Sequence, residues 1–281
     1  MIRTLRRLIK YRHLLVTLTQ RELSARYRGS VLGFLWSLVN PILLLVVYSF
    51  VFNTIFKPRD PTISDYGPYA LFLATGVIPW IWIQTAWLEG TMALLANAGL
   101  IRKATFPAEL LPMVSVAANL VQFVLALPVL AMAFLVTGWV APMFSSGSEE
   151  ITAVTLNWTV LFLPVITLLL IPLVSGVTLA FAALNVHFKD VRDILQNLLT
   201  LLFFMTPILY SLTTLEPYRL LHFVVLCNPF TPFMLAYQEA VFFGRVPGAG
   251  LWLHMVLVAW VTGYVGAWIF DRLSETLVEA V

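Results

Sequence analysis

The feature that most constrains this chain is a series of apolar stretches, each long enough to cross a lipid bilayer as a helix. The hydrocarbon core of a bilayer is ~30 Å thick and needs about 20 helical residues. The composition agrees, because 60% of the residues are hydrophobic and only 11% are charged. A soluble domain carries roughly a quarter of its residues charged. We therefore predict an all-α integral membrane protein with six transmembrane helices. The predicted spans lie near residues 31–56, 66–92, 108–137, 157–184, 194–214 and 250–271.

Basic residues predict the orientation of these spans, because cytoplasmic segments of membrane proteins are rich in Lys and Arg. Eight of the 17 Lys and Arg residues lie within the first 28 positions. With that end in the cytoplasm, the cations left outside are Lys57, Arg59, Arg219 and Arg245. We expect a multi-pass protein with both termini in the cytoplasm and an even number of crossings. The charge forms a local patch beside a membrane, so we expect no nucleic-acid partner.

The first 30 residues form a separate predicted unit, before a single transmembrane domain at 31–281. They are too charged to span. On a helical projection Leu5, Ile9 and Val16 lie on one side and most of the cations lie on the other. An amphipathic helix of this kind rests in the headgroup layer, with its cations near anionic lipid. A solvated basic tail is the alternative.

The stretch between the last two predicted spans is apolar but rich in helix breakers. These breakers include Pro217, Asn228-Pro229, Pro232 and Gly244. Its hydrophobic segments are too short to cross a bilayer. We expect short re-entrant helices within 215–243. One further full crossing is the alternative, but it would break the agreement with the charge distribution.

Several chemistries have no sequence support. None of the four Lys residues follows a Gly, so the chain lacks the phosphate-binding loop that would hold ATP. Cys227 is the only cysteine, and the four His residues have no ligand spacing, so we expect no metal site. We predict no catalytic residue. Glu89 and Glu109 lie near span ends, whereas an ion-coupled carrier usually needs ionisable groups at mid-membrane.

Small and aromatic residues suggest how the helices pack. Gly29, Gly33 and Ser37 are spaced four apart, as are Gly263 and Ala267, and small residues at this spacing let helices approach closely. Packing within the chain and contact between subunits both remain open. Trp80 and Trp87 lie seven apart on one helix face. Together with Trp36, they are either packing or interface residues or candidate channel aromatics that bind sugar rings.

Six short motifs, in order along the chain, resemble those of polysaccharide-exporting ABC transporter permeases, which export O-antigen, teichoic acid and related lipid-linked polymers. The first motif is the run from Gln20 to Trp36, QRELSARYRGSVLGFLW, followed by Asn40-Pro41. The others are Gly76 to Trp80, Asn97 to Pro107 with Leu111-Pro112, Phe188 to Asp193, Thr206 to Tyr210, and Asn228 to Phe230. Each motif is weak alone, but the series covers nearly the whole chain.

The resemblance implies a half-transporter in the bacterial cytoplasmic (inner) membrane. Two copies of this chain would pair with two copies of a separate ATP-binding subunit. ATP and Mg would bind to that subunit, and this chain would bind no cofactor and would not be an enzyme. A coupling helix would dock into the ATP-binding subunit, and a second cytoplasmic loop would be a lesser contact. The implied coupling residues are Leu100, Ile101, Arg102, Lys103, Phe106 and Pro107, and those of the second loop are Lys189, Asp190 and Arg192. Ordinary anchoring by cytoplasmic cations is the alternative for Arg102 and Lys103.

The resemblance also implies that the basic N-terminal helix lies where a lipid phosphate enters. The residues concerned are Arg21, Arg26, Tyr27 and Arg28, with Arg26 and Arg28 as phosphate contacts. General lipid anchoring is an equal alternative for both. The expected substrate is a lipid-linked polysaccharide. An exporter of a drug or small lipid is the second hypothesis. A membrane-embedded glycosyl- or acyltransferase is the third, although it would need a carboxylate pair or a His/Asp constellation that the sequence does not offer.

Overall fold

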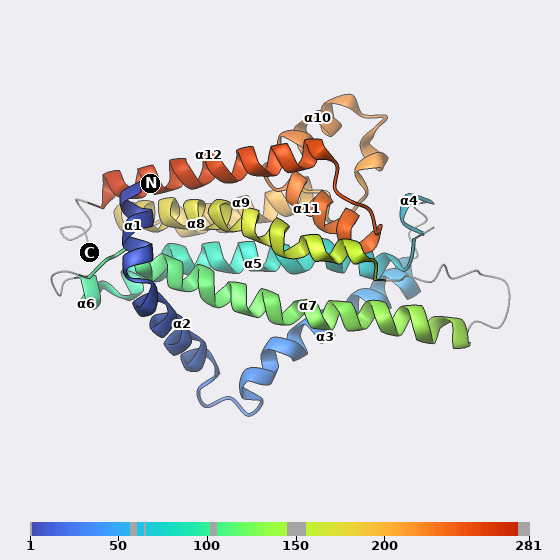
Figure 1. Cartoon of the computed structure of the whole chain (residues 1–281), viewed down its shortest axis with the longest axis horizontal. Coiled ribbons are helices and arrows are strands. Elements are labelled where there is room, and N and C mark those ends of the chain that lie inside the picture. Colours follow the sequence, from blue (N-terminus) through green and yellow to red (C-terminus); the bar gives the residue numbers. More distant parts are fainter. Residues whose placement is uncertain (1, 57–60, 65, 102–105, 145–155, 275–281) are drawn as a thin grey trace.

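The computed structural model describes residues 2–56, 61–64, 66–101, 106–144 and 156–274, and within these ranges the chain is helical without strands (Figure 1). The helices of the N-terminal half are α1 (Ile2–Lys10), α2 (Arg12–Tyr27), η1 (Gly33–Leu35), α3 (Trp36–Tyr48), η2 (Ser49–Phe56), α4 (Pro61–Ser64), α5 (Tyr69–Ala96), α6 (Ala98–Ile101) and α7 (Leu110–Phe144). Those of the C-terminal half are η3 (Trp158–Phe162), α8 (Leu163–His187), α9 (Val191–Met205), η4 (Leu212–Leu215), α10 (Arg219–Cys227), α11 (Thr231–Tyr237), η5 (Gln238–Phe242) and α12 (Ala249–Leu273).

Five helical stretches in the described residues are long and apolar enough to cross a membrane. They are Gly33–Phe56, Tyr69–Ala96, Leu110–Trp139, Trp158–His187 and Ala249–Leu273. Each overlaps a predicted span. A sixth candidate is the pair formed by Arg219–Cys227 and Thr231–Phe242, which is bent by 90°. This pair falls in the segment predicted to be re-entrant, and its geometry is that of a broken or re-entrant span instead of a straight crossing helix.

The predicted span 194–214 is too long at its second end. The corresponding helix α9 has 15 residues and ends at Met205. At ~1.5 Å per residue it is about 22 Å long, which is short of a full crossing. The cause is Pro207, which disfavours helical geometry at the residue before it, and Thr206 is accordingly extended, with φ −96° and ψ 138°. The residues after Thr206 remain hydrophobic, so hydropathy alone does not show where the helix ends.

The irregular backbone after α9 is held by side chains of the bent pair. Gln238 Nε2 donates to the carbonyl oxygen of Pro207 over 2.7 Å, and Asn228 Nδ2 donates to Thr206 Oγ1 over 2.9 Å. All four residues are buried. Non-helical backbone at membrane depth is tolerated only where its polar groups find partners within the protein. The Asn228 and Gln238 side chains supply those partners.

Helix α5 is the centre of the bundle. Of its most apolar 18-residue window, 78% is buried inside the chain, against 11% to 28% for the other four spans. Phe230, at the break between the two helices of the bent pair, inserts between Trp80 and Trp87 of α5, with ring centroids 5.4 Å from each. On the neighbouring face, Trp82 stacks on Phe123 of α7. Aromatic packing thus fixes α5 against α7 and the bent pair.

Helices α8 and α12 approach closely through glycines. A methyl group added to Gly176 of α8 would overlap the carbonyl of Thr262, and one added to Gly266 of α12 would overlap the carbonyl of Gly176. Gly263, for which packing within the chain and a subunit contact were both open, faces Pro172 of α8. The small residues of the last span therefore pack within the chain. Gly29 and Gly33 do not form a helical stripe, because both have positive φ. Gly29 lies in the connection after α2, and Gly33 begins η1 at the start of the first span.

The N-terminal segment consists of two helices instead of the single predicted one, with a break at Tyr11. Both lie at one end of the bundle (Figure 1). There α1 packs against α12 near the end of that last span. The beginning of the chain and the end of α12 are therefore on the same side of the molecule.

Candidate functional site

An exposed strip of α5 interrupts the burial of this central helix. Ile81 and Glu89 are exposed on it, and Gln84 and Thr85 are partly exposed. Three hollows of the surface follow this strip, and the same strip contributes residues to each. We take the strip and the three hollows as the candidate site and refer to them together as the α5 face.

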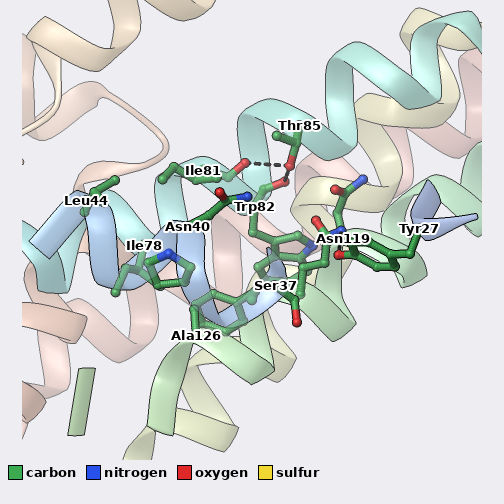
Figure 2. A pocket seen from close by; sticks show the side chains of 13 residues that line it. Tyr27, Ser37, Asn40, Leu44, Ile78, Ile81, Trp82, Thr85, Asn119 and Ala126 are labelled. Carbon is green, nitrogen blue, oxygen red and sulfur yellow. Dashed lines mark hydrogen bonds between the residues drawn. The ribbon is translucent and has the colours of Figure 1, made fainter. Parts of the chain in front are cut away.

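The middle hollow has a volume of about 170 Å³ and lies between α2, α3, α5 and α7 (Figure 2). Its polar lining comes from four different elements, with Asn40 on α3, Thr85 on α5, and Asn119 and Gln122 on α7, while Tyr27 closes it from α2. Gln122 Nε2 donates to the Tyr27 hydroxyl over 2.9 Å. The end of α2 is thereby joined to α7 at the rim of the hollow.

The second hollow is a groove of about 260 Å³ between α3, α5 and α9. Gln84 of α5 and Thr200 of α9 line it together, beside Tyr48 and Phe203. Leu44 and Ile81 line both this groove and the middle hollow, so the two are neighbours. The polar strip therefore extends from the middle hollow into this groove, away from the end of the bundle where α2 lies.

The third hollow is the largest, at about 800 Å³, and lies between α2, α5, α6 and α7. It is also the most polar, with Arg21, Glu22 and Arg26 of α2 facing Glu89 of α5 and Ser115 of α7. Leu100 of α6 lies at its edge. The hollow therefore joins the α5 face to the segment that the sequence predicts as the coupling helix.

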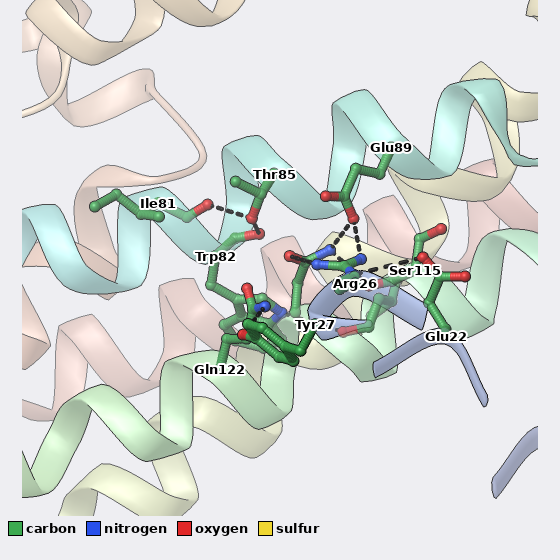
Figure 3. Close-up of polar contacts among 11 residues, drawn as sticks. Glu22, Arg26, Tyr27, Ile81, Trp82, Thr85, Glu89, Ser115 and Gln122 are labelled. Atoms are coloured by element: carbon green, nitrogen blue, oxygen red, sulfur yellow. Dashed lines mark hydrogen bonds and ion pairs between the residues drawn. The ribbon is translucent and has the colours of Figure 1, made fainter. Parts of the chain in front are cut away.

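A polar network separates the third hollow from the middle one (Figure 3). Arg26 is ion-paired with Glu89 through one guanidinium nitrogen and donates to Asn119 Oδ1 over 3.2 Å through another. Asn119 Nδ2 in turn donates to Glu89 over 2.6 Å, and Arg26 also pairs with Glu22 over 3.4 Å. The network closes on itself across α2, α5 and α7, and it fixes α2 against the bundle.

This network changes the interpretation of the predicted phosphate contacts. Arg26 is not a free cation, because two carboxylates and an amide already engage its guanidinium. Arg21 and Arg28 are exposed. Tyr27 packs edge-to-face on Phe34 and accepts the hydrogen bond from Gln122. A phosphate that binds Arg26 has to compete with Glu89.

The described coupling residues lie at the end of the bundle beside α2. Leu100 and Ile101 are in α6, where Ile101 is buried. Phe106 is partly buried and packs against the core, and Pro107 precedes α7. Arg102 and Lys103 lie outside the described residues. Gly99 is the exposed residue of α6, with open space where a side chain would begin.

The predicted second loop joins α8 to α9. Lys189 and Asp190 are exposed in the turn, and Arg192 is exposed in the first turn of α9. The preceding end of α8 lies beside the end of α5, because Asn185 Nδ2 donates to the carbonyl of Thr91 over 3.2 Å. The loop is therefore at the same end of the molecule as α6.

Two of the three candidate channel aromatics are packing residues. Trp80 and Trp87 are only 2% and 3% exposed, and Phe230 occupies the space between them. Trp80 forms the covered floor of the groove between α3, α5 and α9, and Trp87 donates to the carbonyl of Val174. Neither presents a ring face to the surface of the chain, which favours the packing alternative for both. Trp36 is 38% exposed, and its role as a channel aromatic stays a prediction.

Sequence reasoning missed most of the polar residues of the α5 face. Those residues are Asn40, Gln84, Thr85, Asn119, Gln122 and Thr200. The signal that marks them is a polar side chain inside an apolar span, which usually faces the protein interior or a water-filled path. Within the described residues, no group of three or more His, Cys, Asp or Glu side chains could hold a metal ion.

Comparisons with known proteins identify the family of the chain. The model of the ABC-2 type transporter family matches residues 13–242. The chain is 35% identical to the O-antigen export system permease protein RfbA of Myxococcus xanthus over the full length of both chains. It is 29% identical to the Klebsiella pneumoniae protein of the same name, covering 95% of this chain and 94% of the relative. It is 24% identical to the polysialic acid transport protein KpsM of Escherichia coli, covering 92% and 93%. The chain belongs to the ABC-2 type transporter family, whose relatives here are membrane subunits of transporters.

Proposed function

We propose that this chain is the permease subunit of an ABC transporter that exports a lipid-linked polysaccharide across the bacterial cytoplasmic membrane. The observation that carries the proposal is the polar row on the α5 face, from Glu89 through Thr85 to Gln84, in a helix that is otherwise apolar and central. ATP and Mg bind to a separate subunit, in keeping with the missing phosphate loop. The names of the relatives support the same class of cargo.

Polar side chains along a span support a hydrated path. Hydrogen-bonding groups that face lipid tails lose their water partners and are disfavoured. On the α5 face, Asn40 and Thr200 from the flanking helices extend the row of α5. A polysaccharide presents many hydroxyl groups, and such a row offers them successive donors and acceptors. An exporter of a small lipid has less need for a polar row of this length.

The lack of cover over the α5 face supports two copies of the chain per transporter. The first span is only 11% buried, and α9 buries Val191, Leu195 and Leu199 while the rest of its turns stay largely exposed. Helices α3 and α9 flank the polar row. A second copy placed against them would close the row into a channel and cover the flanking apolar surface. We therefore propose a homodimer with two ATP-binding subunits.

The proposed orientation has both termini in the cytoplasm. The contact between α1 and α12 supports it, because it places the start of the chain and the end of the last span on one side. The same side carries α6 and the exposed loop with Lys189 and Arg192. The ATP-binding subunits would dock there, on the surface that the sequence predicts for coupling.

The polar row is tested by removing its hydrogen-bonding groups without changing side-chain size. The double variant Gln84→Leu/Thr200→Val removes one amide and one hydroxyl from the groove. Each hydrogen bond contributes about 0.5–1.5 kcal/mol, so we expect polymer export to fall by about tenfold. The measurement is ATP-driven export of the lipid-linked polymer in proteoliposomes that contain the permease and its ATP-binding subunit.

The matched control is His254→Leu/Thr262→Val, which removes two polar groups from α12, away from the three hollows. Thr262 donates to a backbone carbonyl of its own helix, as Thr200 does, so the loss is comparable. The control should transport normally. Equal losses in both double variants would argue against a polar path on the α5 face. Export of small lipids without export of polymer would favour the drug or lipid exporter instead.

A further inference from the structure

A second surface feature lies away from the α5 face, on the outer side of α8 and α12. It is an apolar groove with a volume of about 470 Å³. Its walls come from α8 and α12, with contributions from α1 and α7, and its lining is almost entirely hydrocarbon, including Leu8, Met113, Leu179, Val256 and Trp260. None of these residues lines the three hollows of the α5 face.

The close approach of the two helices shapes this groove. Gly176 and Gly263 line the groove and also form the contact between α8 and α12, because the backbone or Pro172 of the facing helix lies where their side chains would begin. On α12 the lining runs from Val256 to Ala267. At ~1.5 Å per residue this is roughly 17 Å, or about half of the ~30 Å hydrocarbon core. The groove thus matches the depth of one leaflet.

An aromatic row on α12 leads from the groove to a cation. Trp260, Tyr264, Trp268 and Arg272 are spaced four apart, so each lies beside the next in a row that winds gradually around the helix. Trp260 and Tyr264 stack with ring centroids 5.8 Å apart, and the Arg272 guanidinium lies 5.7 Å from the centroid of Trp268. The three rings are 46% to 64% exposed, and Arg272 is exposed in the last turn of the span.

The short helix α1 lies across the same end of the bundle (Figure 1). Leu8 of α1 enters the lining of the groove, while Arg6 and Lys10 of α1 are exposed. Arg7 anchors the helix by pairing over 3.4 Å with Glu109, which directly precedes α7. The end of the groove lined by Leu8 is therefore at the same end of the bundle as the exposed cations Arg6 and Lys10 of α1 and Arg272 of α12.

We propose that this groove binds one acyl chain of an anionic glycerophospholipid, whose phosphate binds Arg272 and the cations of α1. The hydrocarbon lining fits the chain, and the cations at one end fit the charge of the headgroup. Selectivity comes from the headgroup, because lipid tails in the surrounding bilayer are as apolar as the groove itself. The site is independent of the proposed transport path, since it shares no residue with the α5 face.

Native mass spectrometry of the purified full-length chain tests the site. The protein is offered dioleoyl phosphatidylglycerol or dioleoyl phosphatidylcholine, which differ in headgroup charge and share their acyl chains. Wild type should retain one phosphatidylglycerol at several-fold higher occupancy than phosphatidylcholine. Arg272→Gln should lower phosphatidylglycerol to the level of phosphatidylcholine, whereas Arg272→Lys should keep most of the preference.

Two further variants separate the groove from general charge attraction. Val256→Trp replaces a small side chain on the exposed wall of the groove with an indole ring and should reduce retention of both lipids. Arg219→Gln removes an exposed cation at the opposite end of the molecule and should leave retention unchanged. Thermal unfolding measured on each variant confirms that the fold is intact.

Three results would overturn the proposal. The first is an equal loss of phosphatidylglycerol in Arg272→Gln and Arg219→Gln, which would indicate attraction by charge alone. The second is wild-type retention in a folded Val256→Trp variant. The third is a change in oligomeric mass caused by Val256→Trp, which would show that a second copy of the chain covers the groove.

Discussion

At the scale of single residues, Arg26 shows how the fold reassigns a side chain. The guanidinium has two carboxylate partners that differ in position: Glu22 lies one turn earlier on α2, and Glu89 lies on α5. An exposed pair four residues apart on a helix contributes about 0.3–0.5 kcal/mol. The pair with Glu89 is reinforced by Asn119, which bonds both members. The Arg26–Glu89 pair should therefore be stronger than the Arg26–Glu22 pair.

A double-mutant cycle measures this difference. For Arg26→Gln with Glu89→Gln we expect a coupling of about 1 kcal/mol, allowing for the 42% exposure of the Glu89 side chain. For Arg26→Gln with Glu22→Gln, which serves as the matched control, we expect about 0.3–0.5 kcal/mol. The free energy of unfolding in detergent is the measured quantity. Couplings of equal size would contradict a closed network across α2, α5 and α7.

The partners of Arg26 also mark the limit of single-sequence reasoning. The resemblance to polysaccharide-exporting permeases implied Arg26 as a phosphate contact, with general lipid anchoring as an equal alternative. Its partners Glu89 and Asn119 lie 63 and 93 residues further on. No periodicity connects positions so far apart, so the network could be found only once the helices were packed.

At the scale of elements, the long apolar stretches were predicted well, because an apolar stretch of about 20 residues is long enough to cross a bilayer as a helix. Helix α5 begins three residues after the predicted start of its span, and α12 begins one residue before. The bounds of the shorter helices depend on individual residues, and hydropathy does not detect these. Pro207 ends α9 early, and a break at Tyr11 divides the N-terminal segment into α1 and α2.

The short helix α6 carries the element-scale prediction for coupling. Phe106→Asp would be ambiguous, because Phe106 packs on the core and the variant could lose stability. Gly99→Trp is cleaner, since its side chain would begin in open space. If α6 docks into an ATP-binding subunit, the indole prevents a contact at the centre of that interface, where a few residues carry most of the binding energy. ATPase activity coupled to transport should then fall by about tenfold or more. The measurement is ATPase activity of the reconstituted complex with and without polymer.

The control for this variant is Gly250→Trp, at the start of α12 and the opposite end of the molecule. A side chain there would also begin in open space. It should leave coupling unchanged, because no ATP-binding subunit is expected at that end. Normal coupling in Gly99→Trp, with the protein folded, would show that α6 is not the docking element.

At the scale of the whole molecule, the uneven cover of the spans indicates which surface meets a second copy. Helix α5 is central and mostly buried, yet its polar strip opens between α3 and α9, which are the least covered of its neighbours. A surface that exposes polar groups between two apolar helices is poorly matched to lipid on all sides. Closing it against a second copy resolves the mismatch, and this requires the contact to run along α3 and α9.

Cysteine cross-linking in membranes tests that contact. In a Cys227→Ser background, which removes the only native cysteine, Leu43→Cys on α3 and Leu201→Cys on α9 place thiols on residues that are 52% and 56% exposed. The two variants, expressed together and oxidised, should give a disulfide-linked species of twice the monomer mass. Leu253→Cys on α12 is 71% exposed but lies away from α3 and α9, and should give no disulfide-linked species. Cross-linking through Leu253→Cys alone would place the second copy against α12, and the α5 face would then open to lipid instead of forming a channel.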